Sequence, residues 1–222
     1  MNFLAHAFLS GSDEETIVGN FIADHVKGKP DHRYSAGILN GITLHRLIDE
    51  FTDTHPVVRQ SADRLKPSYA RYSVVIVDMF YDHLLAKHWC EFSSVPLKKF
   101  TRHIYLVMMK HYRILPAKTK RILPFMVADD WMAGYAKPNG LKLALKGMAR
   151  RTRFESGMDK AVGDLQKDYG LYLEEFRLFF PDLQRKVALF EPMQAEPEIK
   201  TIQAKTGTTN FLRRARLRNS HK

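Results

Sequence analysis

Polar residues that could do chemistry recur at helical spacing within apolar segments. In GITLHRLIDEFTDTHP, His45 and Asp49 are four residues apart and Asp53 follows four residues later. These three side chains therefore share one face of a helix. In VIVDMFYDHLLAKHW, Asp78 and Asp82 have the same spacing. Because buried carboxylates are costly unless they are paired, these residues need partners.

Two further segments repeat this pattern. GNFIADHVKG places Asn20 and Asp24 four residues apart among apolar neighbours, and His6 lies in the apolar segment NFLAHAFLS. His83 flanks the carboxylate face of VIVDMFYDHLLAKHW, whereas His88 points elsewhere on that helix. Four segments thus each bring His, Asp or Asn into apolar surroundings.

Each of these residues taken alone has a purely structural explanation. A single histidine such as His6 is more often a core residue with satisfied hydrogen bonds than a ligand. Asp49 could pair with Arg46, and the carboxylates of VIVDMFYDHLLAKHW could form ion pairs with Arg64 and Arg71.

Taken together, the polar residues favour a divalent-metal site. Stacked carboxylates repel and raise each other's pKa, and a cation removes that conflict. Imidazole nitrogen and carboxylate oxygen suit Mn²⁺, Fe²⁺, Zn²⁺ or Mg²⁺, and helical bundles build such sites from separate helices. A metal there would acidify a water molecule and offset charge on a phosphoryl oxygen. The candidate phosphate contacts are Lys27, Arg46, Arg64 and Arg71.

The hydrophobic periodicity predicts an almost entirely helical chain. Ser12 and Glu15 form a capping box for the first helix, and Ser94 is expected to cap a basic helix that ends before Pro116. Pro181 is expected to kink or divide the last helix. Besides the basic helix, the expected helices span about 13–27, 34–54, 57–65, 68–91, 117–135, 139–150 and 157–189.

Composition points to a folded domain followed by a tail. The chain has 222 residues, 45% of them hydrophobic, and a single cysteine. We expect residues 1–190 to form the domain and residues 191–222 a flexible basic tail. The N-terminal segment does not resemble a signal peptide, and no apolar run reaches the roughly 18–20 residues of a membrane span. The expected compartment is therefore the cytoplasm.

The distribution of charge predicts an acidic partner. Lysine and arginine number 35 against 24 aspartate and glutamate, a formal net charge of +11. No acidic residue occurs between Phe92 and Ala128, and a second basic stretch covers residues 142–153. Such regions attract nucleic acid, anionic lipid or an acidic protein. A merely solvated basic surface explains the same distribution.

The segments MNFLAHAFLS, GNFIADHVKG, GITLHRLIDEFTDTHP, VDMFYDHLLAKHW and KGMARR resemble the bacterial acyl carrier protein phosphodiesterase family. That family is similar to the HD phosphohydrolases, so the resemblance implies a single-domain, all-α, HD-like helical bundle with a His/Asp metal site. It implies hydrolysis of the phosphodiester that joins 4′-phosphopantetheine to holo acyl carrier protein. It also implies a divalent metal, Mn²⁺ foremost, with Mg²⁺, Fe²⁺ or Co²⁺ as alternatives.

The resemblance further implies roles for individual residues. The implied metal ligands are His6, Asp24, His45, Asp49, Asp78, Asp82 and His83. The implied catalytic residues are Asp24, His45, Asp49, Asp82 and His83. Phosphate or substrate contacts are expected from Asn20, Lys27, Arg46, Asp53, Arg64 and Arg71. Docking of the acidic carrier is expected at Lys98, Lys99, Arg102, Arg150 and Arg151.

Two other functions remain open on the sequence. The same metal site could act on a nucleotide or another small phosphodiester, because fold alone does not settle the substrate. A helical protein without enzymatic activity could instead bind nucleic acid through residues 92–128 and the basic tail. The last reading leaves the buried Asp and His residues without a purpose.

Overall fold

The computed structural model describes residues 1–26, 28 and 33–192. Within these ranges the chain forms α-helices and short 3-10 turns without a strand, which confirms the expected all-α class. Lys27 and residues 193–222 of the expected tail lie outside the described residues.

Two long helices frame the molecule, α3 (Ala36–Thr54) and α11 (Tyr169–Ala188). The other α-helices are α1 (Phe3–Leu9), α2 (Glu14–Ile22), α4 (Pro56–Tyr69), α5 (Ser73–Lys87), α6 (Leu97–Lys110), α7 (Ala117–Ala128), α8 (Trp131–Gly134), α9 (Pro138–Ala149) and α10 (Val162–Lys167). Short 3-10 turns occur at Ala23–His25, Ala70–Tyr72, Trp89–Glu91, Tyr112–Ile114 and Met158–Lys160.

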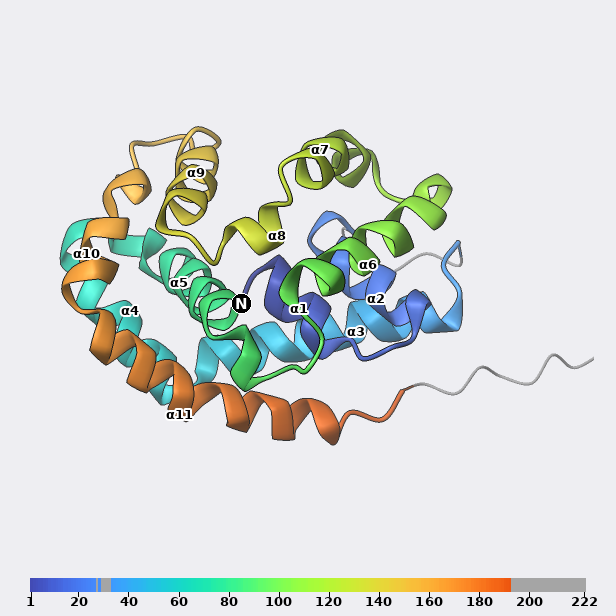
Figure 1. The fold of residues 1–222 in the computed structure, drawn as a ribbon, viewed down its shortest axis with the longest axis horizontal. Helices are drawn as coiled ribbons and strands as arrows, with labels where there is room; N and C mark the ends of the chain where they lie inside the picture. Colours follow the sequence, from blue (N-terminus) through green and yellow to red (C-terminus); the bar gives the residue numbers. More distant parts are fainter. Residues whose placement is uncertain (27, 29–32, 193–222) are drawn as a thin grey trace, which may run out of the picture.

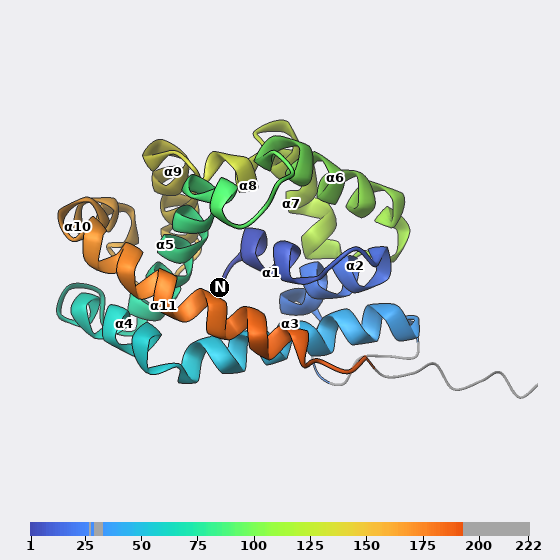
Figure 2. The same ribbon diagram turned by 60° about the horizontal axis from the view of Figure 1, so that its bottom comes forward.

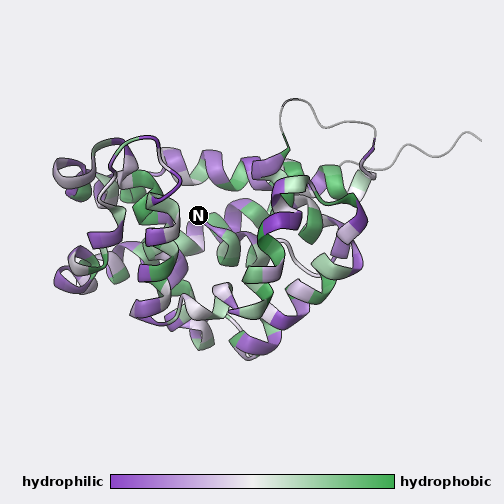
Figure 3. Ribbon diagram, turned by 90° about the horizontal axis from the view of Figure 1, so that it is seen from above, coloured by the Kyte–Doolittle hydropathy of each residue, from purple (hydrophilic) through white to green (hydrophobic). Residues whose placement is uncertain are grey.

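Helix α11 runs along the outside of the molecule and packs on α3, α4 and α5 (Figures 1 and 2). Phe176 and Phe179 of α11 contact Tyr81 of α5 with ring centroids 5.5 Å apart in each pair. Hydrophobic and hydrophilic residues occur together on individual helices (Figure 3), as expected of helices that bury one face. Helix α5 is the exception, since almost its whole length is buried.

Helices α2 and α3 cross at backbone contact. A Cβ atom on Gly19 would lie 2.0 Å from the carbonyl oxygen of Ile38, and one on Gly41 would lie 2.2 Å from that of Thr16. Because no other residue fits at either position, the two glycines set the distance between the helices. This close crossing brings the C-terminal end of α2 next to the middle of α3.

Helix α1 is held in place by carboxylates of α5. The Asp82 side chain accepts hydrogen bonds from the backbone N–H groups of Asn2 (3.1 Å), Leu4 (2.9 Å) and Ala5 (3.3 Å). The Met1 ammonium group donates to Asp78 Oδ1 at 2.8 Å. The N–H groups at the start of a helix have no partner within it, so Asp82 supplies the missing acceptor. In both ribbon views the N-terminus lies near the middle of the molecule.

Two of the expected N-terminal caps are wrong. Asp13, not Ser12, caps α2, and its carboxylate accepts a backbone hydrogen bond there. A carboxylate at this position also interacts favourably with the positive end of the helix dipole, which a serine hydroxyl does not. Ser94 does not cap α6, which begins at Leu97 after Pro96. The residue before a proline is pushed out of the helical region, so Val95 cannot be the first helical residue, as a Ser94 cap would require.

The expected helix boundaries fail mainly where a non-glycine residue adopts a positive φ. The expected helix 68–91 begins only at Ser73, because Ala70 (φ +46°) ends α4, which extends past the expected range 57–65. The expected helix 117–135 is divided at Asp130 (φ +42°). The expected helix 157–189 is divided at Asp168, and α11 continues through Pro181. The expected helix 13–27 ends in a 3-10 turn after Ile22.

Replacing Asp82 by alanine should destabilise the fold. The change leaves buried N–H groups of α1 without an acceptor, so the free energy of unfolding should fall by about 2–4 kcal/mol in urea denaturation at a pH of about 4. Asp63→Ala is the control, because Asp63 forms an exposed ion pair with Lys66 and should change stability by less than about 1 kcal/mol. Equal losses in the two variants would contradict the capping role.

The contribution of Asp82 to stability should also depend on pH. Burial raises the pKa of Asp82 to about 6, against the opposing effects of the N-terminal ammonium group and the backbone N–H donors. Because this pKa lies above that of the unfolded chain, the contribution is fully present below about pH 4 and is lost as the pH rises through 6. Asp82→Asn cannot titrate. The wild-type free energy of unfolding minus that of Asp82→Asn should therefore fall between pH 4 and pH 7, and a rise would refute the assignment.

Candidate metal centre

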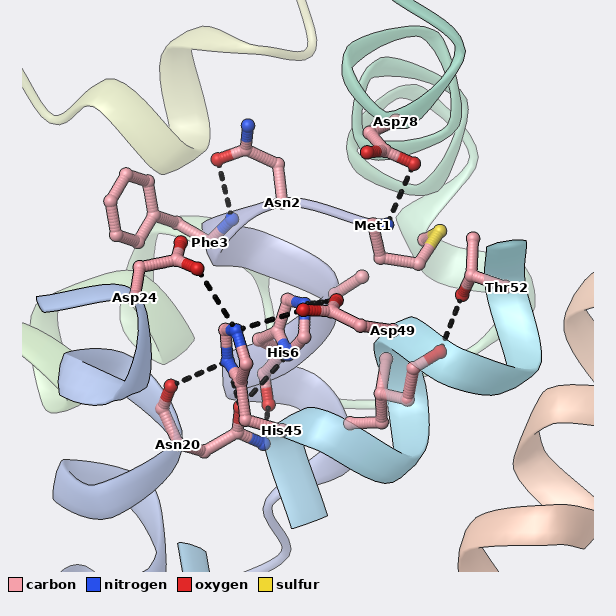
Figure 4. Close-up of polar contacts among 12 residues, drawn as sticks. Met1, Asn2, Phe3, His6, Asn20, Asp24, His45, Asp49, Thr52 and Asp78 are labelled. Atoms are coloured by element: carbon pink, nitrogen blue, oxygen red, sulfur yellow. Dashed lines mark hydrogen bonds and ion pairs between the residues drawn. The ribbon is translucent and has the colours of Figure 1, made fainter. Parts of the chain in front are cut away.

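Five side chains from α1, α2, α3 and the turn after α2 converge on one point (Figure 4). His6 Nε2 lies 3.1 Å from Asp49 Oδ1, and His45 Nε2 lies 3.1 Å from Asp49 Oδ2. His45 Nε2 also lies 3.3 Å from Asp24 Oδ1. The two imidazole rings stack with centroids 4.0 Å apart. Asn20 lies beneath both rings and is fully buried.

The orientation of the Asn20 amide follows from its other hydrogen bonds. Its Nδ2 donates to the carbonyl oxygen of His6 (3.1 Å) and to Ser10 Oγ (2.9 Å). Asn20 Oδ1 therefore faces His6 Nδ1 (2.8 Å) and His45 Nδ1 (3.1 Å). The Asn20 carbonyl oxygen is a second acceptor, 2.9 Å from His45 Nδ1. Since these acceptors require donors, both Nδ1 atoms carry hydrogen.

In this tautomer the Nε2 atom of each neutral ring carries a lone pair that points at a carboxylate. Lone pair and carboxylate repel unless a proton or a cation lies between them. Burial lowers the pKa of His45, but Asp24 and Asp49 outweigh that effect and raise it to about 9. Burial lowers the pKa of His6 despite Asp49. One proton on His45 thus relieves part of the conflict and leaves His6 Nε2 facing an anion.

A divalent cation fits these donors. One potential ligand atom from each of His6, His45 and Asp49 lies within 4.8 Å of the others. Two atoms bound to one ion at about 2.1 Å are roughly 3 Å apart, close to the two separations of 3.1 Å. Metal-binding histidines characteristically donate their other N–H to an oxygen acceptor, as both do here to Asn20. Burial raises the pKa of Asp49, but the two histidines outweigh it and keep that carboxyl ionised.

The cluster lies at a cavity of about 350 Å³. The histidine side chains are only 5% and 8% exposed, whereas the Asp49 and Asp24 side chains are 41% and 66% exposed. The carboxylates thus reach solvent above buried imidazoles, and a phosphoryl group has room beside them. The rest of the lining includes Met1, Asn2, Phe3, Phe21, Asp53, Val74, Val75, Asp78 and Met148.

Three of the expected ligands lie outside this cluster. Asp78 lines the cavity but pairs with the Met1 ammonium group; burial raises its pKa to about 6 although that ammonium group opposes the shift. Asp82 is fully buried, and its oxygens accept hydrogen bonds from the backbone of α1. His83 Nδ1 lies 2.7 Å from the carbonyl oxygen of Tyr135, and burial lowers the pKa of His83. These residues hold neighbouring segments in place.

Two of the expected phosphate contacts are also engaged elsewhere. Arg64 forms two hydrogen bonds with Glu175, and Arg71 lies over the rings of Tyr72 and Phe154. Neither arginine lines the cavity.

Two of the other expected substrate contacts, Asn20 and Asp53, line the cavity of the cluster. Exposed Arg46 donates to the carbonyl oxygen of Gly28 at 3.1 Å. Asp53 lines the cavity, and Asn20 supports the histidines. Lys27 lies outside the described residues.

The expected carrier-docking residues are all exposed. Lys98, Lys99 and Arg102 lie on α6, and Arg150 and Arg151 directly follow α9. Their docking role stays a prediction.

Ser10 and Met1 are site residues that sequence reasoning missed. Ser10 fixes the amide of Asn20, and its spacing of four residues from His6 places both on one helix face. The contact between Met1 and Asp78 joins positions 77 residues apart, and no local pattern indicates it.

The converging residues lie within a region that matches a known family. The family profile described as acyl carrier protein phosphodiesterase matches residues 1–183. The chain belongs to this family. It is therefore an enzyme of the hydrolase class that acts on a phosphodiester. No helix in the described part of the chain is long and apolar enough to cross a membrane.

Several curated relatives carry the family's name, acyl carrier protein phosphodiesterase. The protein from Photorhabdus laumondii is 33% identical over 187 residues, which cover 84% of this chain and 94% of the relative. The protein from Escherichia coli is 31% identical over 193 residues, covering 85% and 98%. That from Yersinia pestis is 29% identical over 187 residues, covering 84% and 97%. No solved structure matches, so the kinship with HD phosphohydrolases stays a prediction.

Replacing Asp49 by alanine should abolish metal binding. The variant removes the one carboxylate that faces both Nε2 atoms, so affinity for Mn²⁺ should fall by at least about 100-fold in equilibrium dialysis. Asp53→Ala is the matched control, because Asp53 is one turn further along the same helix, lines the same cavity and lies outside the ligand group. Similar affinities in both variants would show that Asp49 holds no metal.

Proposed function

We propose that this enzyme is a metal-dependent phosphodiesterase that removes 4′-phosphopantetheine from holo acyl carrier protein and leaves the apo carrier. The supporting observation is the pair of imidazole lone pairs aimed at the Asp49 carboxylate beside an open cavity. The names of the curated relatives reported above give acyl carrier protein as their substrate.

The residues of the cluster fit the chemistry of this reaction. His6, His45 and Asp49 would hold the metal, for which Mn²⁺ is the first choice and Mg²⁺, Fe²⁺ or Co²⁺ are alternatives. When bound, the metal supplies a Lewis acid that lowers the pKa of water and offsets charge on the phosphoryl oxygens. Water adds across the phosphodiester, so that phosphorus gains the hydroxyl group and the carrier serine oxygen gains the proton.

Asp24 is the residue best placed to handle the water. Its side chain is two-thirds exposed at the cavity, and its carboxyl lies 3.3 Å from His45 Nε2. The hydrogen bond with His45 outweighs burial and lowers the pKa of Asp24, so the carboxylate is ionised at neutral pH. An ionised carboxylate at the mouth of the site accepts a hydrogen bond from water and orients it.

The basic surface supports an acidic protein as the substrate. The net charge is +11, and α6 presents Lys98, Lys99 and Arg102 to solvent. Arg150 and Arg151 add positive charge beside the end of α9, where Met148 lines the cavity. Such charges mainly raise the association rate, so the proposed docking weakens as salt screens them.

Loss of the arm can be followed directly by mass spectrometry. Holo carrier incubated with enzyme and Mn²⁺ should shift to the mass of the apo carrier, and free 4′-phosphopantetheine should appear. Asp24→Ala and His45→Ala should each reduce turnover by at least about 100-fold while circular dichroism stays helical. Asp63→Ala, on the exposed face of α4, is the control variant.

The same assay also distinguishes this proposal from the alternative of an enzyme that acts on small phosphodiesters. No loss of the arm with Mn²⁺, Mg²⁺, Fe²⁺ or Co²⁺ would refute the proposal. Hydrolysis of nucleotide phosphodiesters, with the carrier left intact, would instead identify an enzyme for small phosphodiesters.

A further inference from the structure

The bond that the proposed reaction breaks restricts where the carrier can dock. This bond joins phosphorus to the serine oxygen, so only that oxygen and the serine Cβ lie between the phosphorus and the carrier backbone. When the phosphodiester lies beside His6, His45 and Asp49, the carrier surface around its serine must therefore touch the mouth of the cavity. A basic patch elsewhere attracts the carrier from a distance but does not hold it at the mouth.

The start of helix α6 packs on the side of α1 that faces away from the metal cluster. Phe100 of α6 contacts Phe8 and Trp89, with ring centroids 6.4 and 4.8 Å apart. Phe8 follows His6 by two residues, so the two side chains point to opposite sides of α1. Among the described residues, none that lines the cavity belongs to α6. The basic residues at the start of α6 are consequently placed to attract the carrier, not to touch it beside its serine.

A second group of basic residues borders the cavity directly. Val75, in the first turn of α5, lines the cavity, and Arg71 precedes it by four residues. Met148, near the end of α9, lines the cavity as well, and residues 150–154 follow it. The two segments touch, because the Arg71 guanidinium lies over the Phe154 ring with Cζ 5.3 Å from the ring centroid. They form one surface beside the mouth of the cavity.

Two arginines share one aromatic ring on this surface. Arg153 Cζ lies 5.6 Å from the centroid of the Phe154 ring, on which Arg71 also stacks. All three residues are exposed, and neither arginine pairs with a carboxylate in the described part of the chain. Stacking on the ring offsets part of the repulsion between the guanidinium groups and orients both. Apart from one hydrogen bond from Arg71 to the Tyr72 hydroxyl (3.1 Å), their N–H groups can donate to carboxylates of a partner.

The segment that carries Phe154 is strongly basic and ordered by local hydrogen bonds. Residues 150–155 read RRTRFE, with three arginines against one glutamate. The backbone N–H of Thr152 donates to the carbonyl oxygen of Ala149 at 3.2 Å, and Thr152 Oγ1 lies 2.7 Å from the carbonyl oxygen of Phe154. A surface that is ordered before binding loses little conformational entropy when a partner docks.

We propose that Arg71, Arg150, Arg153 and Phe154 form the contact surface for an acidic face of the carrier next to its modified serine. This rests on the proposed function, because that reaction requires the serine at the mouth of the cavity. The arginines bind carboxylates of the carrier, and Phe154 packs against apolar side chains between them. Helix α6 acts only by long-range attraction. Contacts at such a surface lower the dissociation rate, whereas charges outside it raise the association rate.

Two charge reversals of equal size separate contact from attraction. Arg71→Glu/Arg153→Glu alters the contact surface, and Lys98→Glu/Lys99→Glu alters the start of α6 by the same net charge; all four side chains belong to exposed residues. Binding of fluorescently labelled apo carrier is followed by stopped flow without added metal. The first pair should raise the dissociation rate at least about tenfold. The second pair should lower the association rate at low salt and leave the dissociation rate at its wild-type value.

A charge exchange distinguishes lost contact from damage to the fold. The acidic residues of the carrier are changed to lysine one at a time. At least one of these carriers should bind the Arg71→Glu/Arg153→Glu enzyme at least about tenfold more tightly than the unchanged carrier does. If none of them restores binding, the direct contact is refuted.

The remaining outcomes identify which statement fails. A wild-type dissociation rate in Arg71→Glu/Arg153→Glu would overturn the docking assignment, and so would faster dissociation caused by the reversal in α6. Binding to phosphatidylglycerol vesicles that depends on Arg71 and Arg153, with carrier binding unchanged by their reversal, would assign the surface to a membrane and also overturn it. In each of these cases a wild-type enzyme that converts holo carrier to apo carrier leaves the proposed function intact. A wild-type enzyme that neither binds nor cleaves holo carrier overturns the proposed function as well.

Discussion

The hydrogen bonds of the Asn20 side chain determine the chemistry of the cluster. Its Nδ2 is committed to the carbonyl oxygen of His6 and to Ser10, so its Oδ1 accepts from Nδ1 of both histidines. The Nε2 atom of each histidine then carries a lone pair that faces Asp49. A proton on His45 resolves one of these contacts only. A divalent cation resolves all of them, which is why the arrangement supports a metal centre more strongly than the presence of His and Asp alone.

The rest of the fold holds the donors at this spacing. Backbone contact at Gly19 and Gly41 fixes α2 against α3, and so fixes Asn20 relative to the histidine of α3. Asp82 binds the first N–H groups of α1, which positions His6. Asp82 is thus needed by the site without touching it. Helices α1, α2 and α3 bring the cluster together only because these non-local contacts are all made in the same structure.

Much of the site followed from helical spacing, and the failures have physical causes. The four-residue spacing of His45 and Asp49 places them on one face, and the structure brings His45 to both Asp49 and Asp24. Asp82 has the same spacing signal, yet its partners are backbone N–H groups of a segment about 80 residues away, which periodicity cannot reveal. The helix break at Ala70 depends on a positive φ without glycine, so the sequence carries no local mark of it.

The position of the metal is the most direct test of the proposed mechanism. Crystals grown with Mn²⁺ can be measured by anomalous diffraction, which locates the ion independently of the protein atoms. An anomalous peak bound by His6 Nε2, His45 Nε2 and an Asp49 oxygen, at about 2.1 Å from each, is the expected result. A peak at Asp78 or His83 instead, or no peak in an enzyme that still converts holo carrier to apo carrier without added metal, would contradict it.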